Sequence, residues 1–424
     1  MGVNVLKNKI YFVIDMKSFF ASVECAERGL DPSKHCLIVA DESRGKGSIC
    51  LAVSPKMKQL GVKNRCRVYE IPSNISYIVA KPRMKKYIEY ASEIYAIYLK
   101  YIDKNDIHVY SIDECFIDVT DYLKIYKTTA RDFAIKLMKE IEEKLHIPSS
   151  VGIGTNLFLA KVALDITAKK SKDKIGWLDE EKFKKELWHH KPITDFWSIS
   201  YGTQASLEKF GITDLYGVAH FKEDILYKKF GINAELLIDH AWGRESCTIK
   251  DIKNYKRKSK SISHSQIFPK DYDYDDALNC LKEMVQTLCY EAVKQKVVTQ
   301  LIHISISYTN HQIESSKGSV RMSETTNLYS IIEPYVTKLY KKITDRSVLI
   351  RKIGCTFCDL QDLNKESYNL FNQLDLIEKE KKIVKKVIEI QDKFGKNAII
   401  KGNDLKKNAT ALERNKLIGG HNSE

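Results

Sequence analysis

The first 180 residues alternate short apolar runs with amphipathic segments. Residues 9–15 (KIYFVID) and 36–41 (CLIVAD) have the pattern of strands that end on an acidic residue. Residues 131–145 (RDFAIKLMKEIEEKL) carry apolar side chains at helical spacing, and residues 149–155 (SSVGIGT) follow as a strand and a glycine turn. Strand, helix and strand in this order predict an α/β layer with acids at the strand ends.

The pattern changes at about residue 181, where short helices with tryptophans begin. Residues 208–219 (EKFGITDLYGVA) resemble a helix-hairpin-helix, a motif whose backbone amides contact DNA phosphates. Ser198 and Ser200 stand where the usual pair of hairpin glycines would fall, which weakens the phosphate-binding turn. The basic run 251–265 (DIKNYKRKSKSISHS) then predicts a solvated linker before a third globular unit.

The third unit combines a long amphipathic helix with alternating strands. Residues 275–293 (DDALNCLKEMVQTLCYEAV) form one continuous apolar helix face. In residues 301–310 (LIHISISYTN), large apolar side chains alternate with His and Ser, so one sheet face is core and the other is small and polar. That polar face suits either a phosphate backbone or ordinary solvent. The last sixty residues are rich in lysine and predict an appended tail.

Composition narrows the class of protein. A chain of 424 residues that is 43% hydrophobic and 29% charged predicts two to four folded domains. The net charge of +14 favours a polyanionic partner, although a general lysine bias would produce the same excess. Ten scattered cysteines indicate reduced thiols, and the N-terminal apolar run is broken by Asp15 before it could act as a secretory signal. No apolar stretch approaches a membrane span, so we expect a cytoplasmic protein.

Two groups of acids are candidates for chemistry. Asp15 closes the first strand, and Asp113 and Glu114 lie inside the strand-like run 109–119 (VYSIDECFIDV). Unrelated surface acids would give the same spacing. If the two strands are neighbours, however, three carboxylates converge, and such a group needs a divalent cation to offset its repulsion. Oxygen ligands without a His or Cys cluster favour Mg²⁺ over zinc, and paired Mg²⁺ ions are the apparatus of phosphoryl transfer.

Two motifs carry a family resemblance. DMKSFFASVE (15–24) resembles the first motif of the Y-family lesion-bypass DNA polymerases, and YSIDECFID (110–118) resembles the second. The likeness continues through finger, palm, thumb and little-finger segments and covers essentially the whole chain. The stretches QLDLI (373–377) and IGGH (418–421) resemble the UmuC-type branch of Gram-positive bacteria and their mobile elements.

The resemblance implies an α/β fold with an α+β palm, in the right-hand architecture of polymerases. It places a palm at 1–22 and 80–180, fingers at 23–79, a helical thumb at 181–250, a basic linker at 251–262, a βα little finger at 263–362 and a basic tail at 363–424.

The same resemblance implies a DNA-directed DNA polymerase that performs low-fidelity translesion synthesis with two Mg²⁺ ions. Phe20 would be the steric gate that excludes the ribose 2′-OH. The metal ligands would be Asp15, the Met16 carbonyl, Asp113 and Glu114, and the nucleotide contacts would be Phe19, Phe20, Ser54, Lys58 and Lys169.

The implied partners are template-primer DNA, a dNTP and the sliding clamp, with no membrane, and the enzyme would act as a monomer on DNA. The clamp peptide would be formed by Gln373, Leu374, Leu376 and Ile377. Ile377 stands where an aromatic residue is usual, which puts the affinity in doubt. The alternatives are a catalytically silent DNA-binding or regulatory protein of the same descent, and a palm-type nucleotidyl cyclase. Intact acids argue against the first, and the steric-gate motif argues against the second.

Overall fold

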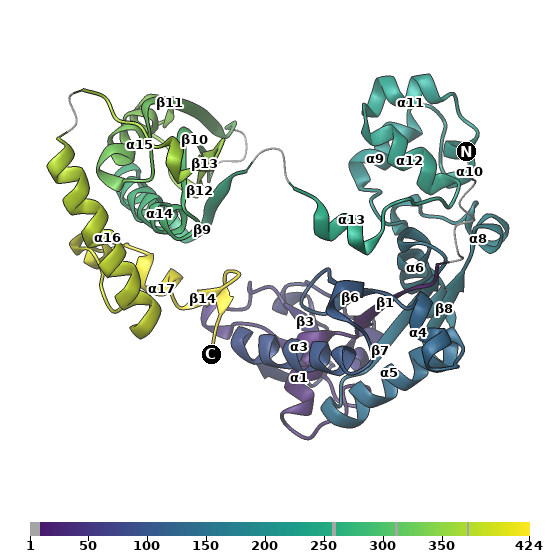
Figure 1. The fold of residues 1–424 in the computed structure, drawn as a ribbon. Coiled ribbons are helices and arrows are strands. Elements are labelled where there is room, and N and C mark those ends of the chain that lie inside the picture. The colour runs from purple at the N-terminus through teal and green to yellow at the C-terminus, as the bar shows by residue number, and fades with distance from the viewer. Residues whose placement is uncertain (1–8, 257–259, 310–312, 371–372) are drawn as a thin grey trace. The chain divides into compact units, whose positions relative to one another are not determined.

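The computed structural model describes residues 9–256, 260–309, 313–370 and 373–424 (Figure 1). The chain divides into two compact units. The first runs to Tyr255 and includes Ser423 and Glu424, and the second is Lys256–Asn422. Each has its own hydrophobic core, and each is described by itself below.

A five-stranded sheet in the order β5-β6-β1-β7-β8 forms the centre of the first unit. Strand β1 is antiparallel to both β6 and β7, and β7 is parallel to β8. The strands are β1 (Tyr11–Met16), β5 (Ile107–Val109), β6 (Glu114–Asp118), β7 (Ser149–Gly154) and β8 (Ile175–Leu178).

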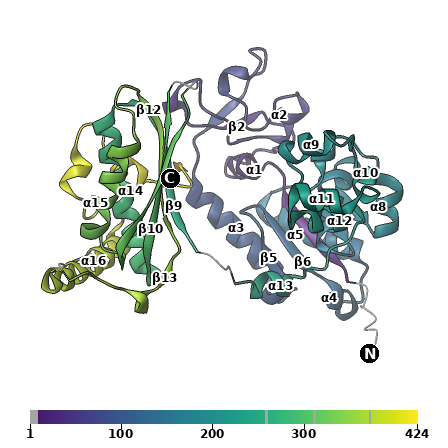
Figure 2. The same cartoon turned by 90° about the horizontal axis from the view of Figure 1, so that it is seen from above.

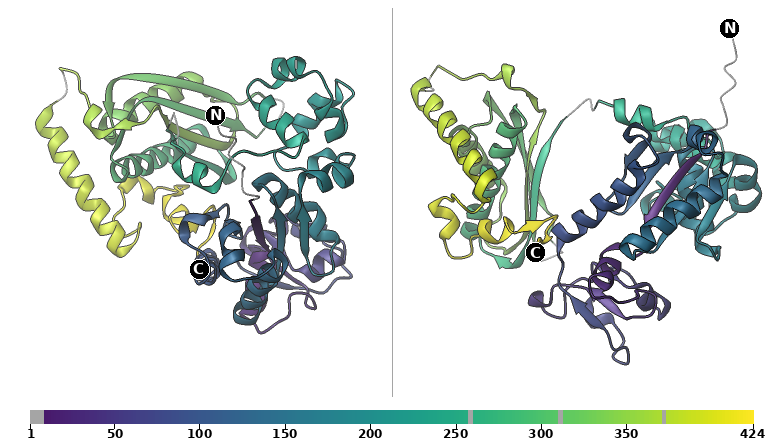
Figure 3. Two further views of the ribbon diagram at one scale, coloured as in Figure 1. Left: turned by 45° about the vertical axis from the view of Figure 1, so that its right-hand side comes forward. Right: turned by 60° about the horizontal axis from the view of Figure 1, so that its bottom comes forward.

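Helices cover both faces of this sheet, because β1 alternates its side chains between them. On one face, α3 (Met84–Leu99) and α5 (Ala130–Leu145) lie side by side, and Phe133 of α5 contacts Phe12 (Figure 3). On the other face, Tyr11 and Val13 pack with the short helix α6 (Leu157–Val162). A π-helical turn (Ala163–Thr167) and α7 (Ala168–Lys170) continue α6, and α4 (Thr120–Ile125) follows β6.

The close approach of α6 to the sheet depends on two glycines of β7. A Cβ atom at Gly152 would stand 2.1 Å from the carbonyl oxygen of Ala160, and one at Gly154 would stand 2.2 Å from the Ala160 nitrogen. No real Cβ tolerates such contacts, so glycine at these positions allows the helix backbone to rest directly on the strand. The glycines in the predicted strand and turn at 149–155 therefore also set the distance between α6 and the sheet.

The remainder of the first unit is a small sheet and a group of short helices. The sheet β3-β2-β4 consists of β2 (Leu37–Val39), β3 (Ala52–Val53) and β4 (Ile78–Ala80), near α1 (Phe19–Ala26) and α2 (Pro55–Gln59). The helices are α8 (Glu180–Leu187), α9 (Tyr201–Glu208), α10 (Leu215–Ala219), α11 (Glu223–Phe230), α12 (Asn233–Ala241) and α13 (Ile249–Asn254). Ser198, which stands at one of the two positions where hairpin glycines were expected, has a positive φ of 73°. The backbone there keeps a glycine-like conformation without glycine.

The second unit is a sheet with helices on one face (Figure 2). The strand order is β11-β10-β12-β9, and β13 pairs with β10. Ile302, Ile304 and Ile306 of β10 point into the core as their alternation predicts. The elements are β9 (Ile262–Tyr272), α14 (Tyr274–Lys294), β10 (Val297–Tyr308), β11 (Ser316–Thr326), α15 (Tyr329–Ile343), β12 (Ile350–Cys358), β13 (Gln361–Asp362), α16 (Leu374–Phe394), α17 (Ala411–Arg414), β14 (Leu417–Ile418) and β15 (His421–Asn422).

Two local expectations were wrong. The run 109–119 is not one strand but a hairpin, in which a turn separates β5 from β6 and the Tyr110 amide donates to the carbonyl of Glu114. The linker expected at 251–262 begins later, because helix α13 continues to Asn254. Thr248 and Asp251 form a capping box at its start, and Ile249 is buried. Residues 257–259 of the expected linker lie outside the described residues.

The lysine-rich tail packs on α14 through polar contacts. Glu283, buried in the middle of that helix, accepts hydrogen bonds from the Thr410 amide and hydroxyl. It also forms an ion pair with Arg414 at 3.4 Å. Ile377 and Ile388 are the buried apolar side chains of α16. The tail therefore belongs to the second unit through a buried carboxylate, while its apolar contribution is small.

Candidate active site

Asp15 and Glu114 are directly opposite each other on neighbouring strands. In the antiparallel pairing of β1 with β6, Asp15 is the Cα partner of Glu114, and Tyr11 is the partner of Asp118. The Met16 amide donates to the Asp113 carbonyl at 2.9 Å, which joins the end of β1 to the turn before β6. The two acidic segments, almost a hundred residues apart in sequence, therefore meet at one end of the sheet.

The face of the sheet that carries Asp15 and Glu114 is the one covered by α6. Lys161 of this helix forms a buried ion pair with Glu114: its Nζ lies 2.9 Å from each carboxylate oxygen and donates its hydrogen bond to Oε2. The same Nζ donates to Asp165 Oδ1 at 3.1 Å. Glu114 and Lys161 each expose only 8% of their surface. A basic residue thus lies within the acid cluster.

The electrostatics show how strongly the acids interact. Burial first, and then the neighbouring charges of Asp113 and Glu114, raise the pKa of Asp15 to about 7. Burial also raises the pKa of Glu114, against the opposing effect of Lys161. Carboxyl groups with these environments are stabilised in their charged form by a cation.

The donor set fits a hard divalent ion. Glu114 Oε1 is buried beside the Lys161 ammonium, 2.9 Å away, and receives no other hydrogen bond from the described residues, so it keeps a lone pair for a further ligand. Asp113 Oδ1 accepts from the Ser111 hydroxyl at 2.6 Å. Within the described residues no group of three or more His, Cys, Asp or Glu side chains already lies close enough to hold a metal ion. Oxygen donors suit Mg²⁺, and a sparse protein cage is usual for it because substrate phosphates complete its coordination.

A sharp turn follows β1 and places two phenylalanines at the start of α1. Ser18 has a left-handed φ of 48°, and Phe19 begins the helix. Phe19 is buried, whereas Phe20 is half-buried and stacks on Tyr87 with ring centroids 4.5 Å apart. The Tyr87 hydroxyl donates to Glu24, which Arg83 also binds with two hydrogen bonds of 2.9 Å. The ring of Phe20 is therefore supported by a buried ionic network.

Lys58 and Lys169 come from different elements; Lys58 is a charged neighbour of Asp15 and Asp113, and Lys169 is a charged neighbour of Lys58. Lys58 lies on α2 and Lys169 on α7. Burial lowers the pKa of Lys58, and its charged neighbours are Asp15, Lys169 and Asp113. Lysines that surround carboxylates in this way form a site for a metal-bound polyphosphate.

Comparisons with known proteins agree with this geometry. The sequence profile of the impB/mucB/samB family matches residues 14–165, and that of the impB/mucB/samB family C-terminal domain matches residues 259–376. DNA polymerase IV 2 of Bacillus subtilis is 30% identical over 421 residues, which are 98% of this chain and 100% of that protein. The chain belongs to the Y-family DNA polymerases of the impB/mucB/samB group.

Further relatives cover the same extent. UvrX of Bacillus subtilis is 30% identical over 417 residues, 97% of each chain. Among solved structures, a Y-family DNA polymerase chimera, Dbh-Dpo4(243-245)-Dbh, is 21% identical with a TM-score of 0.65, over 83% of this chain and 99% of that one. The predicted family and the α/β polymerase fold are thereby confirmed. The individual domain boundaries and the site residues remain predictions.

One predicted nucleotide contact of this Y-family chain is wrong. Ser54 is fully buried, and its hydroxyl donates to the His35 carbonyl at 2.8 Å. The same oxygen accepts from the Leu37 amide at 3.2 Å and from the Met57 amide at 3.3 Å. Ser54 is therefore the N-cap of α2 and a tie to β2, and it has no hydroxyl left for a triphosphate.

The predicted clamp peptide forms the first turn of a helix. Gln373 is the N-cap of α16, and Leu374, Leu376 and Ile377 follow within it. Leu374 and Leu376 are largely exposed, whereas Ile377 is 5% exposed. An extended peptide bound in a clamp pocket would therefore require this turn to open.

Sequence reasoning missed the charged neighbours of the three acids. Lys161 and Asp165 lie in NLFLAKVALD (156–165). The available signal was a lysine and an acid four residues apart on an otherwise apolar helix. Lys17 was also missed. Burial first and the charge of Lys174 second lower the pKa of Lys17 to about 8. Asp15 and Lys58 are among the charged neighbours of Lys17.

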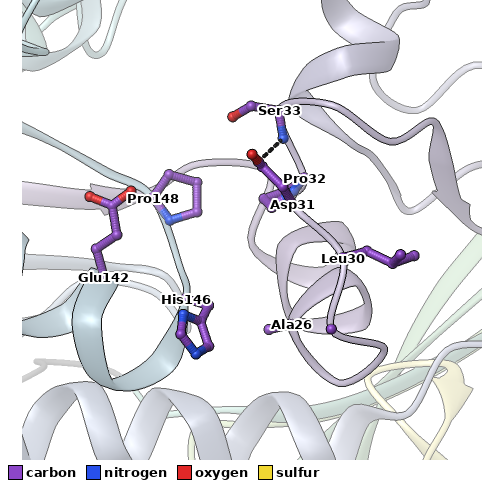
Figure 4. A pocket seen from close by; sticks show the side chains of 9 residues that line it. Ala26, Leu30, Asp31, Pro32, Ser33, Glu142, His146 and Pro148 are labelled. Atoms are coloured by element: carbon purple, nitrogen blue, oxygen red, sulfur yellow. Dashed lines mark hydrogen bonds between the residues drawn. The ribbon is translucent and has the colours of Figure 1, made fainter.

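A separate hollow lies at the other end of α1 (Figure 4). It has a volume of about 310 Å³ and is lined by the loop from Gly29 to Ser33 and by Glu142, His146 and Pro148. None of the predicted site residues lines it. A smaller cavity of about 60 Å³ lies between α3 and the β5–β6 hairpin, where Met16, Asp113 and Glu114 contribute to its wall. The larger hollow is thus distinct from the acid cluster.

No helix among the described residues is long and apolar enough to cross a membrane.

Proposed function

We propose that this Y-family chain is a DNA-directed DNA polymerase that copies past damaged bases. The observation that carries the proposal is the register that sets Asp15 opposite Glu114 at the end of the central sheet, in a chain that belongs to this family. The reaction is attack of a primer 3′-OH on the α-phosphate of a dNTP, with release of pyrophosphate.

Asp15, the Met16 carbonyl, Asp113 and Glu114 would hold two Mg²⁺ ions. When bound, such ions activate the attacking hydroxyl and stabilise charge on the transferring phosphoryl group. The protein supplies the rigid strand ends that aim these oxygens. The buried Oε1 of Glu114, which receives no hydrogen bond from the described residues beyond its contact with Lys161, and the mutual repulsion around Asp15 support this assignment.

The nucleotide would lie between α1, α2 and α7. Lys58 and Lys169 would neutralise the triphosphate as point charges, and the Phe19 and Phe20 amides at the start of α1 would face it. Phe20 would be the steric gate, because its ring is fixed by the stack on Tyr87 while part of it stays accessible.

Template-primer DNA would be bound largely through its phosphates. The outer face of the second unit's sheet presents Ser305 and Ser307 of β10, and their strand partners are Lys317 of β11 and Lys352 of β12. Small polar and basic side chains on a flat sheet suit a sugar-phosphate backbone and carry no sequence information. We assign the palm to 1–22 and 80–180, the fingers to 23–79, the thumb to 181–250 and the little finger to 263–362.

Further partners follow from the same proposal. The enzyme would act as a monomer on DNA. It would be located in the cytoplasm, and the ten free cysteines support a reducing compartment. Gln373, Leu374, Leu376 and Ile377 would bind the sliding clamp after the first turn of α16 opens.

The alternative is a catalytically silent DNA-binding protein of the same descent, and primer extension separates the two. The purified chain should extend a primer on an undamaged template with Mg²⁺ and continue past a single defined lesion in a matched template. DNA binding without any extension on either template would favour the silent alternative. Extension that stops at every lesion tested would leave a polymerase but remove the bypass function.

A further inference from the structure

Lys161 is held in place by its own helix and by the sheet below it. Helix α6 starts at Asn156, whose Oδ1 accepts from the Leu159 amide at 2.8 Å and whose Nδ2 donates to the Gly243 carbonyl at 2.8 Å. The glycines of β7 let this helix rest on the strand that pairs with β1. The backbone that carries Lys161 is therefore fixed relative to Asp15 and Glu114.

The side chain of Lys161 joins two carboxylates. Its Nζ is equidistant from the oxygens of Glu114, at 2.9 Å, and lies 3.1 Å from Asp165 Oδ1. Asp165 lies in the π-helical turn that follows α6, and turns of this kind occur often at functional sites because they redirect a side chain. Asp165 thus holds the same ammonium that contacts Glu114.

A buried carboxylate requires a partner that holds it in one orientation. Glu114 is buried, and its other charged neighbours, Asp113 and Asp165, are acidic. Lys161 is the basic neighbour that acts on both Asp15 and Glu114. Loss of this lysine would leave an uncompensated charge, which a buried site tolerates poorly.

We propose that Lys161 is a positioning residue for nucleotidyl transfer: its ammonium fixes the orientation of the Glu114 carboxylate at the metal site, and Asp165 holds Lys161. This inference rests on the proposed polymerase function. Lys161 does not contact the reacting atoms. It acts through the orientation of Glu114, whose buried Oε1 lies 2.9 Å from Nζ and receives no other hydrogen bond from the described residues, which leaves a lone pair for a ligand.

The test compares Lys161→Met with Lys139→Met. Both remove one lysine from a helix of the first unit, but Lys139 is exposed and pairs only loosely with Glu143, at 3.6 Å. Single-turnover extension gives the maximal rate and the dNTP Kd separately. Mn²⁺ binding is measured by electron paramagnetic resonance on protein bound to a dideoxy-terminated primer-template and the matching dNTP, so that this readout does not depend on turnover.

We expect Lys161→Met to lower the maximal rate and to weaken Mn²⁺ binding by about 10–100-fold, as is usual when the partner of a metal ligand is removed. The dNTP Kd should change by less than about threefold, because the triphosphate contacts remain. Lys139→Met should match the unmodified protein in all three quantities. Asp165→Asn should give a smaller loss with the same split between rate and Kd.

Two results would overturn the inference. Normal rate and Mn²⁺ affinity in a Lys161→Met protein with a lowered Tm would mean that the lysine only stabilises the fold. Tighter Mn²⁺ binding would mean that Lys161 competes with the metal and does not prepare its ligand. If Lys161→Met does not fold, Asp165→Asn decides, and an unchanged rate there would equally reject the role.

Failure of the proposed function would look different. An unmodified protein that extends no primer would remove the polymerase activity, whereas the Mn²⁺ comparison between the two lysine variants would still report on Lys161.

Discussion

Two acids directly opposite each other on paired strands are unfavourable, because like charges in this arrangement repel at close range. Asp15 and Glu114 occupy such a position. Burial is the first cause of the raised pKa of both carboxyl groups, and the charges of Asp113 and Glu114 add to it at Asp15. Asp118, at the other end of β6, is instead satisfied by Lys9 at 2.7 Å and by the Thr120 hydroxyl at 2.6 Å. The end of the strand pair where the acids repel each other is the proposed active site, and the end where Asp118 is paired has a structural explanation.

Asp113→Asn should abolish primer extension and leave DNA binding intact. Asp113 lies in the turn before β6 and is only half-buried, so an amide fits without disturbing the core. The amide lacks the charge that a Mg²⁺ ligand supplies. Asp118→Asn is the matched control on the same hairpin, and its extension should stay near that of the unmodified protein. Gel-based extension and fluorescence anisotropy on one DNA measure the two properties, and full extension by Asp113→Asn would reject the active-site assignment.

Phe20→Ala should admit ribonucleotides. Removal of the ring opens the space next to Tyr87, and the loss of a steric penalty of about 1.4 kcal/mol or more changes discrimination by about tenfold or more. The quantity to measure is the ratio of kcat/KM for dNTP and rNTP. Tyr87→Phe, which keeps the stack and removes only the hydroxyl, is the control. Unchanged sugar discrimination in Phe20→Ala would place the gate elsewhere.

The sequence located the acids of the site but not their environment. Asp15, Asp113 and Glu114 interrupt apolar runs. Charged residues at such positions indicate a cation site, and this indication needs only the sequence pattern. Lys161 interrupts an apolar helix in the same way, yet its partner is almost fifty residues away and is found only from the strand pairing. The prediction for Ser54 was wrong for the opposite reason. A serine before proline can either cap a helix or contact a ligand, and only the three-dimensional structure shows that Ser54 caps α2.

At the scale of elements, α3 and α5 are joined beneath the sheet by one carboxylate. Glu140 of α5 accepts from Lys100 at 2.7 Å, from Lys144 of its own helix, and from the Tyr101 hydroxyl at 2.6 Å. These hydrogen bonds lower the pKa of Glu140 to about 2. A folded-state pKa below the unfolded value means that this group stabilises the fold above about pH 4.5. The contribution disappears as pH falls through the folded-state pKa, towards about 2.

Glu140→Gln should therefore lower the free energy of unfolding by about 1–2 kcal/mol near pH 7, since the hydrogen bonds lose their charge assistance. The deficit should shrink between about pH 4.5 and the acid limit of folding, because the parent's own carboxylate is then being protonated. Urea titrations at several pH values measure this. Glu143→Gln on the same helix, whose partner Lys139 is exposed, should be nearly neutral throughout. A deficit that is constant with pH would show that packing, not charge, is what Glu140 contributes.

Most elements were predictable because their apolar period is long and regular. The helix expected at 275–293 is α14, and the alternation expected at 301–310 follows β10 as far as Tyr308. The apolar pattern of 109–119 did not show the turn of the hairpin, because Ile112 continues that pattern through the turn. Its register is set by β1, a partner distant in sequence. Helix α13 was missed because its basic composition outweighed the short capping signal of Thr248 and Asp251.

At the scale of the molecule, each unit has its own core. The largest cluster of buried side chains in the second unit runs from Phe268 of β9 to Phe357 of β12, and those of the first unit lie around α6, the sheet β3-β2-β4 and α8–α12. The acids and the predicted nucleotide lysines all belong to the first unit. The polar sheet face with Ser305, Lys317 and Lys352 belongs to the second. The proposed active site and the proposed DNA-binding face therefore belong to different units of the chain.

That separation makes a prediction about salt. Lys317 and Lys352 are exposed on the outer face of the sheet, opposite the face that packs on α14 and α15. If each neutralises one phosphate, Lys317→Ala/Lys352→Ala should reduce the slope of log K against log salt by about 2, since each contact contributes about one unit. Affinity should fall equally on DNAs of unrelated sequence, while the maximal extension rate on saturating DNA stays within about twofold.

The control must carry the same charge change on the other face. Lys338→Ala/Lys341→Ala, with both lysines exposed on α15, should leave the salt slope unchanged. Anisotropy titrations at several salt concentrations provide the slopes, and single-turnover extension provides the rate. An equal loss of slope in the Lys338/Lys341 variant would mean that net charge alone governs binding. A lowered maximal rate in the Lys317/Lys352 variant would mean that this face also aligns the primer end, which would couple the two units during the reaction.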